Sequence, residues 1–72
     1  MKIQILFGRR IRALREQKCW SQDYLSDVSG LHRTYISGIE RGVRNPTITI
    51  VEQLSVALDV PISSLFNQES EK

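Results

Sequence analysis

The hydrophobic residues of this chain recur at helical spacing, and no segment alternates polar and apolar residues for long enough to form a strand. Phe7, Ile11 and Leu14 share one face of a segment from about 4 to 18, while its charged residues fall on the other faces. This pattern predicts an amphipathic first helix that ends near Cys19.

Two short helices are predicted next, separated by a tight turn. Ser21 can cap the first of them, because its side chain can accept a hydrogen bond from a free amide of the opening turn, and Gly30 ends it. The second begins at about His32, buries Ile36 and ends at Gly42, since glycine readily adopts the left-handed conformation that follows a helix.

Thr47 can cap a fourth helix in which Val51 and Leu58 lie on one apolar stripe. Pro61 opens a last short helix, because the fixed backbone angle of proline is tolerated in a first turn. The sequence therefore predicts an all-α fold of five helices, in one compact domain over residues 1–72.

Length and charge refine this expectation. A chain of 72 residues with 40% hydrophobic content suits one small domain. Such a domain buries only about 60% of the surface of its unfolded chain, so we expect marginal stability, which dimerisation would relieve. Residues 1–45 hold nine basic and four acidic residues, a balance of +5, while residues 46–72 hold one basic and four acidic residues, a balance of −3. This division favours a polyanionic partner for the first part, although an ordinary solvated surface explains it about as often.

Several function classes are excluded by what the chain lacks. One cysteine, Cys19, allows no internal disulfide, and one cysteine with one histidine cannot supply a structural zinc site. Gly8 and Arg9 interrupt the apolar start well before the length of a signal peptide or a membrane span. Cys19 and His32 could make a nucleophile and a base, but a thiol needs an activating neighbour and a substrate cleft, for which so small a helical domain offers little room. We therefore expect a cytoplasmic protein without metal, cofactor, membrane contact or enzymatic activity.

The two short helices and their turn match the helix-turn-helix unit, in which the second helix enters the major groove and the first crosses the DNA backbone. The run SQDYLSDVSGLHRTYISGIERGVRNPT resembles the helix-turn-helix of the phage-repressor and Cro family, also called the xenobiotic-response-element type. RTYISGIER followed by RN also resembles the controller proteins of restriction-modification systems. The resemblance implies a lambda-repressor-like DNA-binding domain whose helix-turn-helix spans about 21–41, in the second and third helices.

This resemblance implies that the opening of the third helix faces the bases. Arg33 is the best candidate for direct readout, which we favour over a phosphate contact, because a guanidinium can donate two hydrogen bonds to O6 and N7 of guanine. Thr34 can contact a thymine methyl group or accept a hydrogen bond, and His32 either reaches a base or merely begins the helix. Ser37 lies one turn further on the same face, where it can touch a base or the backbone.

The same resemblance implies phosphate contacts at both ends of the motif. Gln22 begins its first helix, and Arg41, Arg44 and Asn45 flank the end of its second. Contacts of this kind position a protein on the duplex without specifying sequence. Tyr35 either bonds a phosphate through its hydroxyl or packs against the scaffold, and its place beside an isoleucine favours packing.

Three positions depart from the family pattern. Cys19 stands where glycine commonly ends the first helix, so we expect a strained or altered turn. His32 replaces the usual serine, threonine or aspartate, so the helix cap must be weak or come from elsewhere. Gly38 occupies a position where the family often has a longer base-reading side chain, and the absence of that side chain would narrow the DNA sequence that the protein can read. Arg15 and Glu40, by contrast, match an ion pair that joins the first and third helices in related domains.

These features predict a sequence-specific transcription regulator that binds double-stranded DNA as a homodimer. Dimerisation through the fourth and fifth helices, about 47–67, would set two recognition helices about 34–36 Å apart on a palindromic operator. We expect no small-molecule effector in a single domain, and activation would need a surface patch that touches RNA polymerase. The alternative is an antitoxin-like protein-interaction module. Antitoxins usually carry an additional segment that binds the toxin, and here only about six polar residues follow Phe66. The candidates for the dimer interface are Ile48, Val51, Ile62 and Leu65.

Overall fold

The computed structural model describes residues 2–66, and the all-α prediction is confirmed. The expected fifth α-helix is instead a single 3-10 turn, because the four residues after Pro61 are too few for an α-helical ladder and form i→i+3 bonds such as Ser64 N–H to the Pro61 carbonyl. The polar segment that follows Phe66 lies outside the described residues. The elements are α1 (Ile3–Gln17), α2 (Gln22–Ser29), α3 (Arg33–Glu40), α4 (Ile48–Leu58) and the 3-10 helix η1 (Ile62–Leu65).

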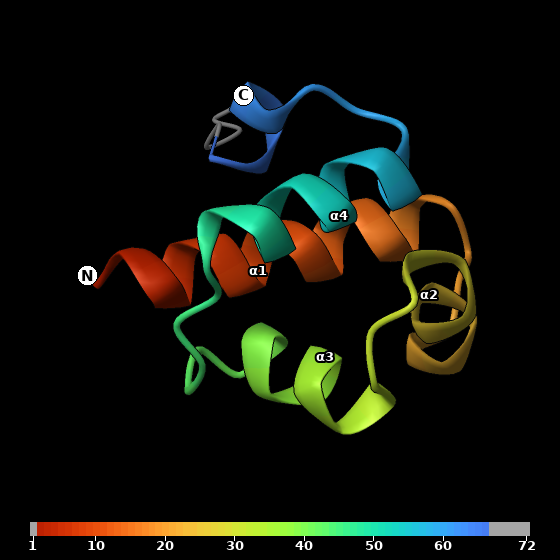
Figure 1. Ribbon diagram of the computed structural model, residues 1–72, viewed down its shortest axis with the longest axis horizontal. Helices are drawn as coiled ribbons and strands as arrows, with labels where there is room; N and C mark the ends of the chain where they lie inside the picture. The colour runs from red at the N-terminus through yellow and green to blue at the C-terminus, as the bar shows by residue number, and fades with distance from the viewer. Residues whose placement is uncertain (1, 67–72) are drawn as a thin grey trace.

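α1 runs along the longest dimension of the molecule, with α3 below it and η1 above it (Figure 1). α3 packs against α1, α2 packs against both α3 and α4, and η1 contacts α1 and α4. None of the helices in residues 2–66 combines the length and the apolar character that crossing a membrane requires. One core lies between the elements, and its largest fully buried side chains are Ile11, Leu25, Ile36, Ile39, Leu54, Leu58 and Leu65.

Side-chain caps begin the helices where the sequence predicts them. Ser21 Oγ accepts a hydrogen bond from the amide of Tyr24 at 3.0 Å, and Thr47 Oγ1 accepts one from the amide of Ile50 at 3.3 Å. Each bond satisfies an amide that has no partner inside its helix. Gly30 ends α2 with a φ of 77°, so the predicted boundaries of α2 and the start of α4 are confirmed.

A close approach of two backbones brings α1 against α3. Gly8 is buried, and a Cβ atom added to it would overlap the carbonyl oxygen of Ile39. Only glycine therefore allows α1 to pass this near to the end of α3. The approach fixes the position of α3 on the scaffold, while the opposite end of α3 projects outward.

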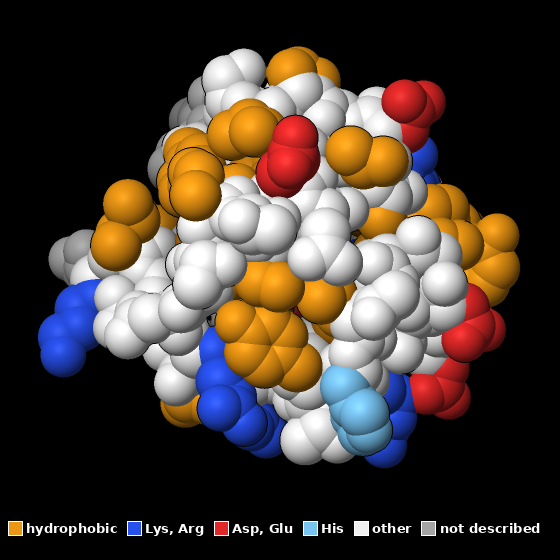
Figure 2. Space-filling model, in the orientation of Figure 1, with side chains coloured by type: hydrophobic (Ala, Val, Ile, Leu, Met, Phe, Trp, Pro, Cys, Tyr) orange, Lys and Arg blue, Asp and Glu red, His pale blue; other side chains and the backbone are white. Residues whose placement is uncertain are grey.

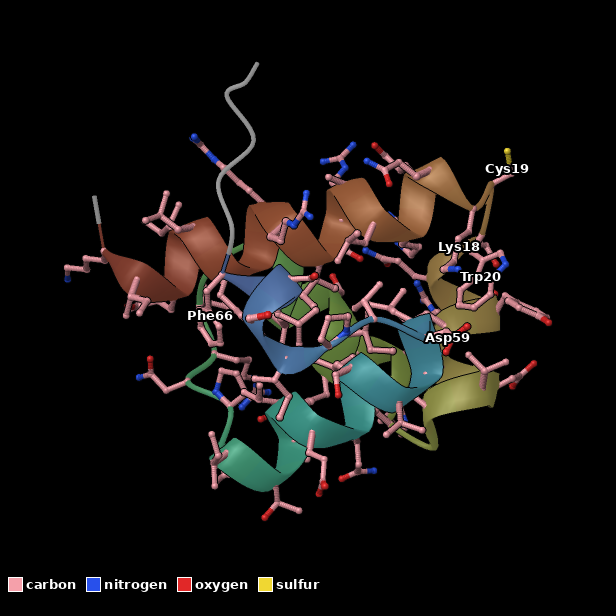
Figure 3. All side chains as sticks on the ribbon, turned by 90° about the horizontal axis from the view of Figure 1, so that it is seen from above. Lys18, Cys19, Trp20, Asp59 and Phe66 are labelled. Atoms are coloured by element: carbon pink, nitrogen blue, oxygen red, sulfur yellow. The ribbon has the colours of Figure 1, made fainter. Side chains whose placement is uncertain are left out.

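The connection between α1 and α2 turns at Cys19, which has a φ of 60°. This is the left-handed conformation that glycine adopts at the lowest cost, so the expected strain at this position is confirmed. Figure 3 shows the Cys19 sulfur pointing away from the molecule, while Lys18 and Trp20 lie together, with Lys18 Nζ 5.3 Å from the Trp20 ring centroid. Asp59 ends α4 with a φ of 58°, a left-handed residue that the sequence pattern did not indicate.

Candidate nucleic-acid interface

The turn between α2 and α3 is held by side-chain hydrogen bonds. Ser26 Oγ donates to the Leu31 carbonyl at 2.5 Å, and Ser29 Oγ accepts from the Leu31 amide at 3.1 Å. Gln53 of α4 donates to the Ser29 carbonyl at 3.3 Å and ties the turn to the body of the domain. The two helices are therefore held at a defined angle, as a helix-turn-helix requires.

His32 supplies the cap of α3 itself. Its Nδ1 accepts a hydrogen bond from the amide of Thr34 at 3.3 Å, a long distance that suits a weak cap. His32, Arg33 and Thr34 are all exposed, and Ser37 is half-buried one turn later. The cap supports the structural role of His32, while Arg33 and Thr34 are the side chains that the first turn of α3 presents to solvent.

Arg33 is paired with an acidic residue of the neighbouring helix. Its Nε lies 3.0 Å from Oδ1 of Asp23, in the first turn of α2. Both side chains are largely exposed, Arg33 at 57% and Asp23 at 79%. The sequence pattern did not indicate this ion pair, because ten positions and a turn separate the two residues.

Arg44 is the most precisely placed of the basic residues after α3. Its guanidinium carbon lies 5.5 Å from the ring centroid of Tyr35, and its stem crosses Gly38, where an added Cβ would lie 2.7 Å from Arg44 Cγ. The missing side chain of Gly38 therefore makes room for Arg44. Tyr35 is half-buried and packs against the core, as its neighbourhood in the sequence favours. Arg41 and Asn45 are also exposed.

A buried network joins the motif to α1. Arg15 donates from Nε and Nη2 to the two carboxylate oxygens of Glu40, at 2.7 and 3.0 Å, and from Nη1 to the Trp20 carbonyl at 2.6 Å. Hydrogen bonding to Glu40 raises the pKa of Arg15 above its ordinary value, although burial acts in the opposite direction. Gln22 Nε2 donates to Glu40 Oε1 at 3.0 Å, so one amide proton of Gln22 is used by the scaffold and one is left for an outside acceptor.

The candidates for a subunit interface divide into two pairs. Ile48 is 75% exposed and Ile62 is 39% exposed, so both can meet another molecule. Val51 and Leu65 are 5% and 0% exposed, because other parts of the same chain cover them; Leu65 is a core residue, while Val51 also lines the groove beside Ile48. An open apolar groove adjoins Ile48, and it is lined by Ile3, Gln4, Phe7, Asn45, Pro46, Ile48, Val51 and Phe66.

Basic and apolar side chains gather over different parts of the molecule, although an acidic side chain lies among the apolar ones and hydrophobic side chains lie beside the basic ones (Figure 2). Figure 2 shows Lys and Arg side chains along the lower edge, over α3, with acidic side chains beside them at α2. Hydrophobic side chains gather over the opposite part, where α4 begins and η1 lies. Within residues 2–66 no three His, Cys, Asp or Glu side chains come close enough together to hold a metal ion. The arrangement offers a basic face to a polyanion and an apolar face to another surface.

An exposed short helix, held at a defined angle by a capped helix and a tight turn, defines a helix-turn-helix domain. The chain belongs to the helix-turn-helix family HTH_3, whose model matches residues 11–65.

Known members of this family are similar over most of the chain. Control protein C.BamHI of Bacillus amyloliquefaciens is 44% identical over 66 residues, which cover 90% of this chain and 82% of that protein. The restriction-modification controller protein C.AhdI of Aeromonas hydrophila has a structure that matches with a TM-score of 0.85 at 43% identity, over 88% of this chain and 96% of that one. The structure of the C.Esp1396I controller tetramer in complex with its natural 35-base-pair operator matches with a TM-score of 0.84 at 36% identity, over 92% and 87% of the two chains. The resemblance stated from the sequence is thereby confirmed.

Proposed function

We propose that this protein is a sequence-specific transcription regulator that binds double-stranded DNA as a homodimer, in the manner of a restriction-modification controller protein. The observation that carries the proposal is the exposed first turn of α3, with Arg33 and Thr34 open to solvent on the part of the molecule where Figure 2 shows Lys and Arg side chains. The proposal is also supported by the similarity to the controller protein C.Esp1396I, whose structure was determined in complex with its operator.

In this proposal different residues of α3 and its flanks make the base contacts and the phosphate contacts. Arg33 reads a guanine through two hydrogen bonds, and Thr34 and Ser37 contact neighbouring bases or backbone. His32 begins the helix and lies at the edge of the base-facing row. The phosphate contacts, which hold the protein on the duplex without specifying sequence, come from Gln22, Tyr35, Arg41, Arg44 and Asn45.

The proposed subunit interface uses the exposed apolar residues at the start of α4 and at η1. Ile48 and Ile62 are its centre, and the groove beside Ile48 adds Ile3 and Phe66. Exposed apolar surface of this kind, set apart from the basic face, is typical of interaction sites. A dimer formed there would present two copies of α3 to successive turns of a palindromic operator.

Selection of binding sites from random duplex DNA at two salt concentrations tests the proposal, because the electrostatic part of binding falls steeply with salt and carries no sequence information. We expect an enriched palindromic motif at both concentrations. Absence of any motif would contradict the proposal and favour an antitoxin-like interaction module.

Two variants then separate base readout from phosphate binding. Arg33→Ala should relax preference at one base position of each half-site and weaken operator binding about 5- to 150-fold, the range for one bidentate base contact. Arg44→Ala should weaken all sequences alike and reduce the salt slope by about 1. An unchanged motif for Arg33→Ala would show that the guanidinium does not read a base.

A further inference from the structure

The base-facing end of α3 has an acidic neighbour that the proposed contacts do not use. Asp23 Oδ1 lies 3.0 Å from Arg33 Nε, on the side of the molecule where α2 and α3 meet (Figure 1). Ser21, not Asp23, caps α2. Asp23 is therefore not held beside Arg33 by acting as the cap of its own helix.

Stability is a poor explanation for this ion pair. The side chains of Asp23 and Arg33 are 79% and 57% exposed, and ion pairs in such positions contribute little to folding because water screens them. The two residues nevertheless carry opposite charges at the point where the motif would meet DNA. A negative charge next to phosphates opposes binding, and although Asp23 suits the dipole in the first turn of α2, that effect does not require its contact with Arg33.

The contact between Asp23 and Arg33 is made at one edge of the guanidinium. Asp23 contacts Nε, and within residues 2–66 neither terminal Nη group of Arg33 donates a hydrogen bond. A guanidinium is a rigid planar fork, so a contact at Nε restricts the direction in which the Nη groups point. Two nitrogens at the tip of the fork are still free to donate to O6 and N7 of one guanine.

We infer that Asp23 is a specificity-determining residue that orients Arg33 for base readout. The inference rests on the proposed function, in which Arg33 contacts a base. Asp23 acts in two ways that both raise the ratio of operator affinity to random-duplex affinity. It restricts a flexible side chain before binding, which lowers the entropy lost on the operator, and its charge repels phosphates wherever Arg33 finds no guanine.

Asp23→Asn tests this inference, with Asp27→Asn as the matched control. Asp27 is exposed on the same helix, one turn further along, and the structure shows no ion pair between it and another residue of 2–66. Both variants raise the net charge by one, so both should tighten binding to random duplex, and Asp23→Asn should do so more because its charge lies beside Arg33. Only Asp23→Asn should lower the ratio of operator to random affinity, by about three- to tenfold, a fraction of the discrimination of one bidentate contact.

The ratio should be measured at two salt concentrations, with thermal unfolding of each variant as a check on folding. In an Arg33→Ala background, Asp23→Asn should change the ratio no more than Asp27→Asn does. Asp23→Glu keeps the charge and should retain most of the ratio. Equal ratios for Asp23→Asn and Asp27→Asn would overturn the inference while leaving the proposed function intact, whereas a wild-type protein that selects no motif would overturn both.

Discussion

The buried ion pair between Arg15 and Glu40 makes the strongest prediction about stability. Glu40→Gln keeps the size of the side chain and removes the charge that faces Arg15. The side chains of Glu40 and Arg15 are only 4% and 11% exposed, so water cannot replace the lost partner. Removing one member of a buried pair costs about 3–5 kcal/mol, because the other charge stays buried and unpaired.

This loss is large for so small a chain. Globular proteins are stable by about 0.05–0.15 kcal/mol per residue, or about 4–11 kcal/mol for a chain of this length. In a domain of this size each kcal/mol shifts the melting temperature by about 4–8 °C, so Glu40→Gln should lower it by about 12–40 °C. Thermal unfolding followed by circular dichroism measures the shift.

Glu16→Gln is the matched control for this prediction. Glu16 pairs with Arg12 at 3.0 Å on the exposed side of α1, where an ion pair contributes at most about 1 kcal/mol. Glu16→Gln should therefore lower the melting temperature by only a few degrees. Similar losses for the two variants would refute the argument that burial gives the Arg15–Glu40 pair its importance.

The pH dependence of this pair follows from the direction of the shift. Hydrogen bonding to Glu40 raises the pKa of Arg15, so the stability that the Arg15 charge contributes is fully present below its ordinary pKa and is lost only as pH rises through the raised value. That window lies far above neutral pH. The difference in melting temperature between wild type and Glu40→Gln should consequently stay constant from neutral to mildly alkaline pH.

Three further substitutions test the surface and the turns. Gly38→Ala should displace Arg44, since the new Cβ would lie 2.7 Å from Arg44 Cγ. In a filter-binding assay the variant should therefore bind operator and random duplex more weakly to the same degree, with a reduced salt slope. An unchanged salt slope would contradict the loss of a phosphate contact from Arg44. Cys19→Gly should raise the melting temperature by about 4–16 °C, because a left-handed residue with a side chain costs about 1–2 kcal/mol, and a decrease would show that the turn carries no strain. Ile48→Asp should shift the protein to a monomer in sedimentation, while Val56→Asp, an equally exposed change further along α4, should not; a shift for both or neither would contradict the assigned interface.

The features that sequence predicted well are local ones. Ser21 and Thr47 cap the helices they precede, and Gly30 ends α2, because each of these effects depends on residues within one turn. Periodicity also identified the apolar face of α4. It could not show what covers that face, which is why Val51 was assigned to a subunit interface and is found in the core. A stripe of apolar residues looks the same in sequence whether its partner is the same chain or another.

The contacts that shape the candidate interface were beyond sequence reasoning, because they join side chains from different elements. Asp23 reaches Arg33 only because the turn sets α2 beside α3. Gly38 looked like a position that had lost a base-reading side chain, yet its bare surface is where Arg44 crosses the helix. In both cases the residue type was visible in the sequence, but its function depends on a neighbour that only the fold supplies.

The loop between α3 and α4 belongs to both proposed surfaces. Asn45, a proposed phosphate contact, lines the same groove as Pro46 and Ile48. A subunit seated on that groove would order the loop before DNA arrives, so less conformational freedom would be lost on binding. The Ile48→Asp monomer should therefore bind even a single half-site less tightly than one wild-type subunit does, in addition to losing the avidity of two linked sites. Equal affinities per subunit for a duplex that carries one half-site, measured above the concentration at which the wild type dimerises, would show that the interface and the phosphate contacts act independently.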